Sequence, residues 1–174
     1  MATTTRVGVA LAIPEPHAAA LSGWRRRIGD PEAYKIPPHV TLLPPTDFEL
    51  DQLEIVEKHL ADAATAVLPF TMRLAGTGSF RPVSQVVFVQ VSTGIAECEL
   101  LEEAVRRHPI DRELEFPYHP HVTVGHDIPD ERLDEAFEGL RDFIAQFAVD
   151  HFTMYSQDDD GTWQVHRKFE LTGP

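Results

Sequence analysis

The sequence predicts an α+β fold made of two lobes with pseudo-twofold symmetry, formed by a single domain over residues 1–174. Apolar segments rich in β-branched residues, such as RVGVALAI at 6–13, alternate with segments whose apolar residues recur at helical spacing. The tripeptide His-Val-Thr occurs at 39–41 and again at 121–123, once in each half of the chain. Because no linker separates the halves, the pattern indicates one packed unit rather than two independent domains.

The individual elements follow from periodicity and from proline and glycine signals. Four helices are expected, at 17–28, 51–67, 94–108 and 131–147. Seven strands are expected, at 6–13, 39–43, 69–75, 85–91, 120–125, 149–155 and 163–171. The second strand is short because Pro37-Pro38 and Pro44-Pro45 enclose it. The order is strand, helix, His-Val-Thr strand, helix, strand, twice over, with strands shared between the halves.

The composition limits the classes of partner. A formal net charge of −13 argues against non-specific binding to duplex DNA or RNA, while a small phosphate can still bind in a locally basic pocket. The only cysteine is Cys98, which is typical of a protein of the reducing cytosol. No stretch approaches the roughly 18 apolar residues that cross a bilayer, and the N-terminus is interpreted as a first strand. We therefore expect a cytoplasmic monomer with no membrane partner.

The two His-Val-Thr copies predict paired acid–base chemistry. In a strand, residues i and i+2 share a face, so His39 projects with Thr41 and His121 with Thr123. Histidine titrates near pH 6.5, so one imidazole can accept a proton while the other donates one. In-line cleavage of a phosphodiester needs such a pair, and the threonine hydroxyls can hold the non-bridging oxygens. Either histidine can take either role.

The sequence resembles the two-histidine (2H) phosphoesterase superfamily, in particular its 2′-5′ RNA ligase-like branch of RNA 2′,3′-cyclic phosphodiesterases. Members carry two His-x-Thr/Ser motifs, matched here by HVTL at 39–42 and HVTV at 121–124. The opening segment RVGVALAIPEP, the central GTGSFRPVSQVVFVQV and the closing FTMYSQDDDGTWQVHRKFEL are also similar to the family pattern. The resemblance implies a bilobal fold in which two antiparallel sheets flank a cleft, with helices on the outside.

The resemblance also implies an activity. His39 and His121 would be the general acid and base, and Thr41 and Thr123 the phosphate-holding residues. The reaction would be the metal-independent opening of a 2′,3′-cyclic phosphate at an RNA or nucleotide end, with a 2′-phosphate product and no cofactor. Ligation of RNA ends through a 2′-5′ bond uses the same residues in reverse, and we expect it to be minor because water is far more abundant.

The residues around the motifs suggest weaker candidates for substrate contacts. Several family members place an arginine three residues after the second threonine, where this chain has His126, a weaker and pH-dependent phosphate contact. Prolines 44–45 replace a more usual aromatic stretch after the first motif. Further candidates are residues near the motifs or in loops that could border the cleft: Arg81, Phe80, Tyr118, Tyr155 and Lys35.

Two alternative sites are disfavoured by their ligand patterns. His119, His121 and His126 raise the possibility of zinc, but Pro120 separates the first two and no cysteine accompanies them, so we expect no metal. The run at 158–161 (DDDG) lacks the spacing of a calcium loop and predicts a solvated hairpin turn.

Two further interpretations stay open at the level of sequence. The cluster RRR at 25–27 is expected on the solvated face of the first helix, with guidance of an RNA strand as the alternative. For the whole protein, the alternatives are a non-catalytic nucleotide- or phosphate-binding protein, and a two-histidine enzyme acting on another small phosphoester. The presence of both histidines and both threonines favours catalysis.

Overall fold

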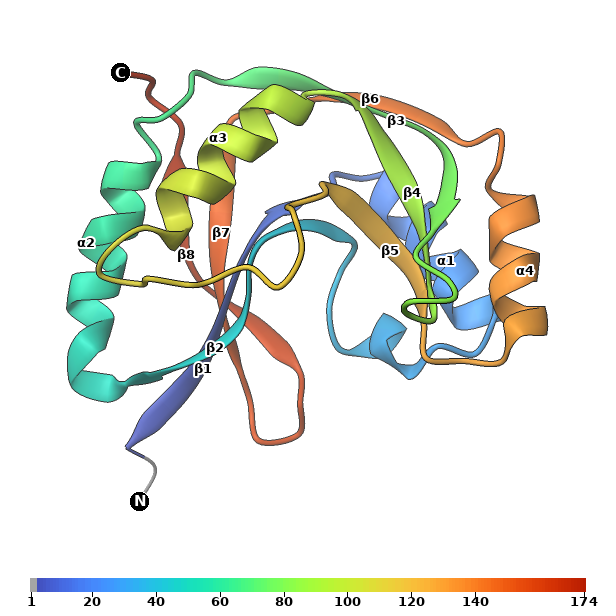
Figure 1. Ribbon diagram of the computed structural model, residues 1–174, viewed down its shortest axis with the longest axis horizontal. Helices are drawn as coiled ribbons and strands as arrows, with labels where there is room; N and C mark the ends of the chain where they lie inside the picture. The colour runs from blue at the N-terminus through green and yellow to red at the C-terminus, as the bar shows by residue number, and fades with distance from the viewer. Residues whose placement is uncertain (1–2) are drawn as a thin grey trace.

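The computed structural model describes residues 3–174, which form one antiparallel sheet of eight strands with four α-helices and two 3-10 helices (Figure 1). The α+β class predicted from the sequence is confirmed. The helices are α1 (His17–Arg27), α2 (Leu53–Ala63), α3 (Ile95–Arg106), α4 (Asp130–Gly139), η1 (Pro31–Tyr34) and η2 (Leu50–Gln52). The strands are β1 (Thr4–Ala12), β2 (His39–Glu49), β3 (Phe70–Ser79), β4 (Val86–Thr93), β5 (His121–His126), β6 (Ile144–Val149), β7 (His151–Gln157) and β8 (Trp163–Glu170). Across residues 3–174, no helix is long and apolar enough to cross a membrane.

The sheet consists of two four-stranded halves that meet at its centre. The strand order is β6-β3-β4-β5-β2-β1-β7-β8, with every neighbouring pair antiparallel. Within the described residues, β2 and β5 share one register pair, Val40 with Val122, whereas the other neighbouring strands pair over at least four positions. The two predicted sheets are therefore the two halves of one sheet, and the cleft lies where the halves diverge.

Two helices, α1 and α3, tie the two halves together by crossing between them (Figure 1). Helix α1 lies between β1 and β2 in sequence but packs on β5 of the other half, beside α4. Helix α3 lies between β4 and β5 in sequence but packs on β2, beside α2. Each half therefore buries its apolar face under a helix supplied from the other half. The buried apolar side chains of both halves form one continuous core.

The predicted fourth helix at 131–147 is wrong beyond residue 139. Helix α4 ends at Gly139, and Ile144–Val149 forms strand β6 instead, paired along β3 from Ala75 to Phe70. The burial of β6 mostly alternates, as in a strand with one face on a core. Sequence periodicity continued through Ile144, but the unpaired edge of β3 offers this short apolar segment a ladder of backbone hydrogen bonds.

The second strand is longer than predicted, because the prolines at 44–45 lie inside it rather than ending it. Strand β2 continues to Glu49. The register between β1 and β2 shifts between Val7 and Val9, the part of the ladder that faces these prolines. Proline has no backbone N–H to donate, and a bulge is the place in a sheet that tolerates this loss.

A tyrosine hydroxyl forms a hydrogen bond between the two halves, in addition to the pairing of β2 with β5. Tyr118, in the loop before β5, donates from its hydroxyl to the backbone carbonyl of Thr41 in β2, at 2.8 Å. Burial raises the pKa of this phenol well above its ordinary value, so the hydroxyl keeps its proton and stays a donor. The bond joins the loop before β5 to β2, next to the place where the two motif strands share one register pair.

We expect Tyr118→Phe to lower the free energy of unfolding by about 1–2 kcal/mol, because the Thr41 carbonyl loses its partner while the ring still fills its space. Urea denaturation of the variant and the wild type measures the difference. The exposed Tyr34, replaced by phenylalanine, is the matched control and should leave the midpoint unchanged. An unchanged midpoint for Tyr118→Phe would show that the bond contributes nothing to joining the halves.

Candidate active site

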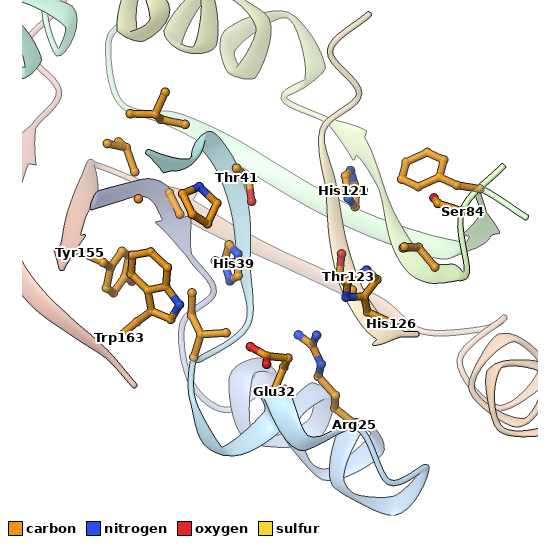
Figure 2. A pocket seen from close by; sticks show the side chains of 18 of the residues that line it. Arg25, Glu32, His39, Thr41, Ser84, His121, Thr123, His126, Tyr155 and Trp163 are labelled. Carbon is orange, nitrogen blue, oxygen red and sulfur yellow. The ribbon is translucent and has the colours of Figure 1, made fainter. Parts of the chain in front are cut away.

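The two His-Val-Thr motifs meet at the centre of the sheet. Val40 and Val122 form the register pair and are completely buried. Continued in antiparallel order, this register places His39 opposite Thr123 and Thr41 opposite His121. Figure 2 shows the four side chains in that order on either side of one space. The arrangement has approximate twofold symmetry, with each histidine facing the threonine of the other motif.

Each imidazole is fixed by a backbone carbonyl two residues before it. Nδ1 of His39 lies 2.9 Å from the carbonyl oxygen of Pro37, and Nδ1 of His121 lies 2.6 Å from that of His119. A carbonyl oxygen only accepts, so Nδ1 must carry the proton in both rings. In the neutral ring, Nε2 then holds a lone pair. Both histidines are therefore in the tautomer that leaves Nε2 to act as a base or, once protonated, as an acid.

The local sequence explains why both copies adopt this geometry. A proline, Pro38 or Pro120, stands between each histidine and the residue whose carbonyl accepts from its ring. Proline fixes its own φ near −65° and holds the preceding residue in an extended conformation. The carbonyl is thereby placed beside the imidazole by local backbone preferences. The motif that matters structurally is X-Pro-His-Val-Thr, which occurs in both halves.

Burial lowers the pKa of both catalytic candidates. The pKa of His39 is lowered to about 4, mainly by desolvation and further by the charges of Arg25 and His121, while its bond to the Pro37 carbonyl opposes the shift. Desolvation also lowers the pKa of His121, and by less. Both rings are therefore neutral near pH 7, and His121 takes up the first proton as the pH falls.

The motifs open into a pocket of about 620 Å³. Its lining includes His39, Thr41, His121 and Thr123, so the structure brings these four side chains to one cavity. Aromatic side chains lie on both sides of them. Phe80 lines the pocket beside His121 of β5, and Tyr155 and Trp163 line it on the side of β1 and β7 (Figure 2). Phe116 is a further aromatic lining residue. Such walls are suited to the stacking of a nucleobase.

Two phenylalanines pack against the second motif. The ring centroid of Phe80 lies 5.0 Å from that of His121, in an edge-to-face arrangement, and Phe88 lies 5.1 Å from the same imidazole. His119 contacts the same two rings at 5.5 Å and 5.2 Å. These apolar contacts remove water from His121 and explain the desolvation that lowers its pKa.

Of the remaining candidates from the sequence, some line the pocket and the others lie outside it. Phe80, His126 and Tyr155 line the pocket. Tyr118 lies behind the motif, where it binds the Thr41 carbonyl. His126 presents its ring at the pocket, with Nε2 3.2 Å from Asp127 Oδ2, and its backbone N–H donates to Asp30.

Arg81 and Lys35 lie outside the set of lining residues. The Arg81 guanidinium turns to helix α4, where it pairs with Asp134 at 2.8 Å and with Asp130 at 3.5 Å. The Lys35 carbonyl accepts from the N–H of Trp163, and the lysine side chain lies over Gly161 in the β7–β8 turn. Both residues brace elements at the edge of the cleft.

The interpretation of residues 25–27 as a solvated face is wrong for the first of them. Arg25 is buried, with 9% of its side chain exposed, and it lines the pocket. Its Nε donates to Oδ2 of the fully buried Asp30 at 2.8 Å. The sequence gives a partial signal, because Asp30 follows the helix by only three residues. What places the pair inside is that α1 packs on β5.

Trp163, Glu32 and Ser84 also line the pocket and were not identified from the sequence. Trp163 is at the start of β8 and lies over Gly8 of β1, where a Cβ would approach the indole to 3.4 Å. No local pattern marks these residues, since they come from a 3-10 helix, a loop and the last hairpin.

Neither alternative ion site gains support from the arrangement. Among residues 3–174 there is no group of three or more histidine, cysteine, aspartate or glutamate side chains that could hold a metal ion. The acidic run at 158–160 forms the β7–β8 turn, where Asp160 accepts the Thr162 N–H and Asp158 accepts from Gln164.

Known proteins are similar to this chain in fold and in sequence. A family model described as the 2′-5′ RNA ligase superfamily matches residues 13–161. A protein of Bacillus mycoides (strain KBAB4) named "Putative phosphoesterase" is 34% identical over 152 residues, covering 86% of this chain and 87% of that protein. The structure of Escherichia coli LigT complexed with NADP+ superposes with a TM-score of 0.67 at 22% identity, covering 97% of this chain and 99% of LigT. TT0787 of Thermus thermophilus gives a TM-score of 0.62 at 25% identity, covering 97% of this chain and 98% of TT0787.

Fold and paired motifs together define a phosphoesterase of the two-histidine class. The chain belongs to the 2′-5′ RNA ligase superfamily. The resemblance seen in the sequence is therefore confirmed at the level of the family.

Asp30→Ala should lower the free energy of unfolding by about 3–5 kcal/mol, because it leaves the buried Arg25 guanidinium without a counter-charge. It also removes the acceptor for the backbone N–H groups of Glu32 and His126. Chemical denaturation measures the loss. Asp47→Ala is the control, since the Asp47–Arg6 pair is exposed on both sides and should matter little. A similarly small effect for both variants would contradict the structural role of Asp30.

Proposed function

We propose that this phosphoesterase opens 2′,3′-cyclic phosphates at RNA or nucleotide ends to give the 2′-phosphate. The observation that carries the proposal is the pair of imidazoles on opposite sides of one pocket, each with Nδ1 bound to a carbonyl and Nε2 left for chemistry. Displacement in line at phosphorus needs a base on the side of the attacking water and an acid on the side of the leaving oxygen.

The order of the two pKa values supports one assignment of the roles. Since the pKa of His39 is the more strongly lowered, the singly protonated site carries its proton on His121. His39 then takes a proton from water as the water oxygen forms its bond to phosphorus. The bond from phosphorus to the ribose 3′ oxygen breaks, and His121 gives its proton to that oxygen. The products are a 2′-phosphate monoester and a free 3′-hydroxyl.

The threonines are proposed to hold the phosphate during this step. Thr41 and Thr123 flank the same space as the imidazoles, and a hydroxyl can donate to a non-bridging oxygen (Figure 2). Attack of the water adds negative charge to these oxygens, so fixed donors both position the group and stabilise that charge.

Pocket size and charge support a nucleotide or a short RNA end as the substrate. A cavity of about 620 Å³ with aromatic walls is suited to a nucleoside carrying one phosphate. The net charge of −13 repels long polyanions. E. coli LigT, which shares the fold, has solved structures complexed with 3′-AMP and with phosphate.

His39→Ala and His121→Ala should each lower kcat for 2′,3′-cyclic AMP by about 10²- to 10⁴-fold, the usual contribution of a general acid or base. Because the imidazoles move the protons in this mechanism, EDTA should leave the wild-type rate unchanged. The control is His108→Ala, which removes an exposed histidine outside the pocket. Turnover that survives the loss of either motif histidine in a folded protein would refute the mechanism.

The pH dependence of kcat/KM should be bell-shaped with its maximum between about 4 and 6.5, on the acid side of an ordinary histidine. The base must be neutral, so the rate falls below the pKa of His39, which is about 4. The acid must be protonated, so the rate also falls above the pKa of His121, which lies below 6.5. Initial rates at low substrate concentration across pH 3.5–8.5 measure both limbs. A maximum above pH 7 would contradict the assignment.

A further inference from the structure

Arg25 is the one lysine or arginine among the pocket-lining residues of the described chain. It is the first of three arginines at the end of α1, and its neighbours Arg26 and Arg27 are exposed. The motif histidines do not replace this charge, because both are neutral near pH 7. A phosphate that enters the pocket therefore meets one permanent positive charge.

The guanidinium is held by a carboxylate that three structural elements fix in place. Oδ2 of Asp30 accepts Nε of Arg25 at 2.8 Å and the backbone N–H of His126 at 3.0 Å. Oδ1 accepts the backbone N–H of Glu32 at 2.9 Å. Asp30 is thus bound from α1, from β5 and from η1, and its side chain has no exposed area. Held in this way, the arginine loses little further freedom when it binds a ligand.

The ion pair occupies only one side of the guanidinium. Nε faces Asp30, and the end that carries the two outer nitrogens points into the space between His39 and His126 (Figure 2). A buried ion pair is weak evidence for a purely stabilising role, since two apolar residues would often serve equally well. Within residues 3–174 the Arg25 side chain is hydrogen-bonded through Nε alone. A planar guanidinium can bind a phosphate through two parallel hydrogen bonds from its outer nitrogens.

We propose that Arg25, oriented by Asp30, is the phosphate-binding cation of this pocket and that its outer nitrogens donate to the non-bridging oxygens of a phosphate seated between the two motifs. The inference rests on the proposed function for the kind of ligand, but it requires only binding and not turnover. Glu32 lines the same wall and brings an opposing negative charge (Figure 2).

The test compares the binding of adenosine 2′-monophosphate with that of adenosine by calorimetry, because the ratio of the two affinities isolates the phosphate. In the wild type the phosphate should tighten binding. Arg25→Met should remove about 10- to 100-fold of that preference, the usual effect of charge-assisted hydrogen bonds, and leave the affinity for adenosine unchanged. Arg26→Met makes the same change in net charge at an exposed position and should have no effect.

Arg25→Lys keeps the test valid if Arg25→Met fails to fold with Asp30 unpaired. A lysine ammonium lies one bond beyond the position of the arginine Nε, near that of Cζ, so it can keep the ion pair with Asp30 but lacks the outer nitrogens. We expect about a tenfold loss of phosphate preference. Glu32→Gln should shift the preference the other way, because it removes the opposing charge. A phosphate preference that is absent in the wild type or unchanged in Arg25→Lys overturns the inference.

Hydrolysis of 2′,3′-cyclic AMP, measured on the same proteins, separates this inference from the proposed function. Phosphate binding that depends on Arg25 in a wild type without turnover supports the inference and refutes the proposed function. Turnover that depends on both motif histidines, with equal phosphate preference in the wild type and Arg25→Lys, supports the proposed function and overturns the inference.

Discussion

The pairing of Val40 with Val122 sets both the junction of the two halves and the geometry of the site. These valines are buried while the histidine and threonine on either side of each face the pocket. In a strand, a slip of one residue moves every side chain to the other face, so a shift here would bury imidazoles in the core and expose valines. The packing of the core therefore holds the catalytic candidates in register. The exchanged helices α1 and α3 add to this constraint, because each clamps the half to which it does not belong in sequence.

The electrostatics of the pocket differ from those of the molecule as a whole. The protein carries a net charge of −13, yet the pocket combines neutral motif imidazoles with one oriented arginine and one carboxylate, that of Glu32. Desolvation by the surrounding walls accounts for most of the lowered pKa values, and the charge of Arg25 lowers that of His39 further. The same guanidinium that attracts a phosphate thus helps to keep His39 unprotonated. A bound phosphate has the opposite effect, since a nearby negative charge favours the protonated imidazole.

Prediction from sequence succeeded where the signal was local or repeated. The first three helices and the motif strands follow from periodicity and from proline and glycine signals, and the repeated tripeptide indicated the two-lobed plan. Prediction failed at Ile144–Val149, where an apolar spacing compatible with a helix was overridden by the free edge of β3. It also failed at Pro44-Pro45, which a bulge accommodates within β2. In both places the neighbouring strand decided the outcome, and a single sequence does not specify which strand that is.

The sequence by itself determined the family, the paired motifs and the local geometry of each histidine, because proline and the alternation of a strand act over a few residues. Only the tertiary structure decided what surrounds them. It brought Asp30 to the backbone of His126, 96 positions away, and so turned Arg25 inward. It placed Trp163 in the pocket and turned Arg81 to helix α4. These contacts join segments distant in the chain, so the energy that selects them comes from packing the two halves together and leaves no local pattern.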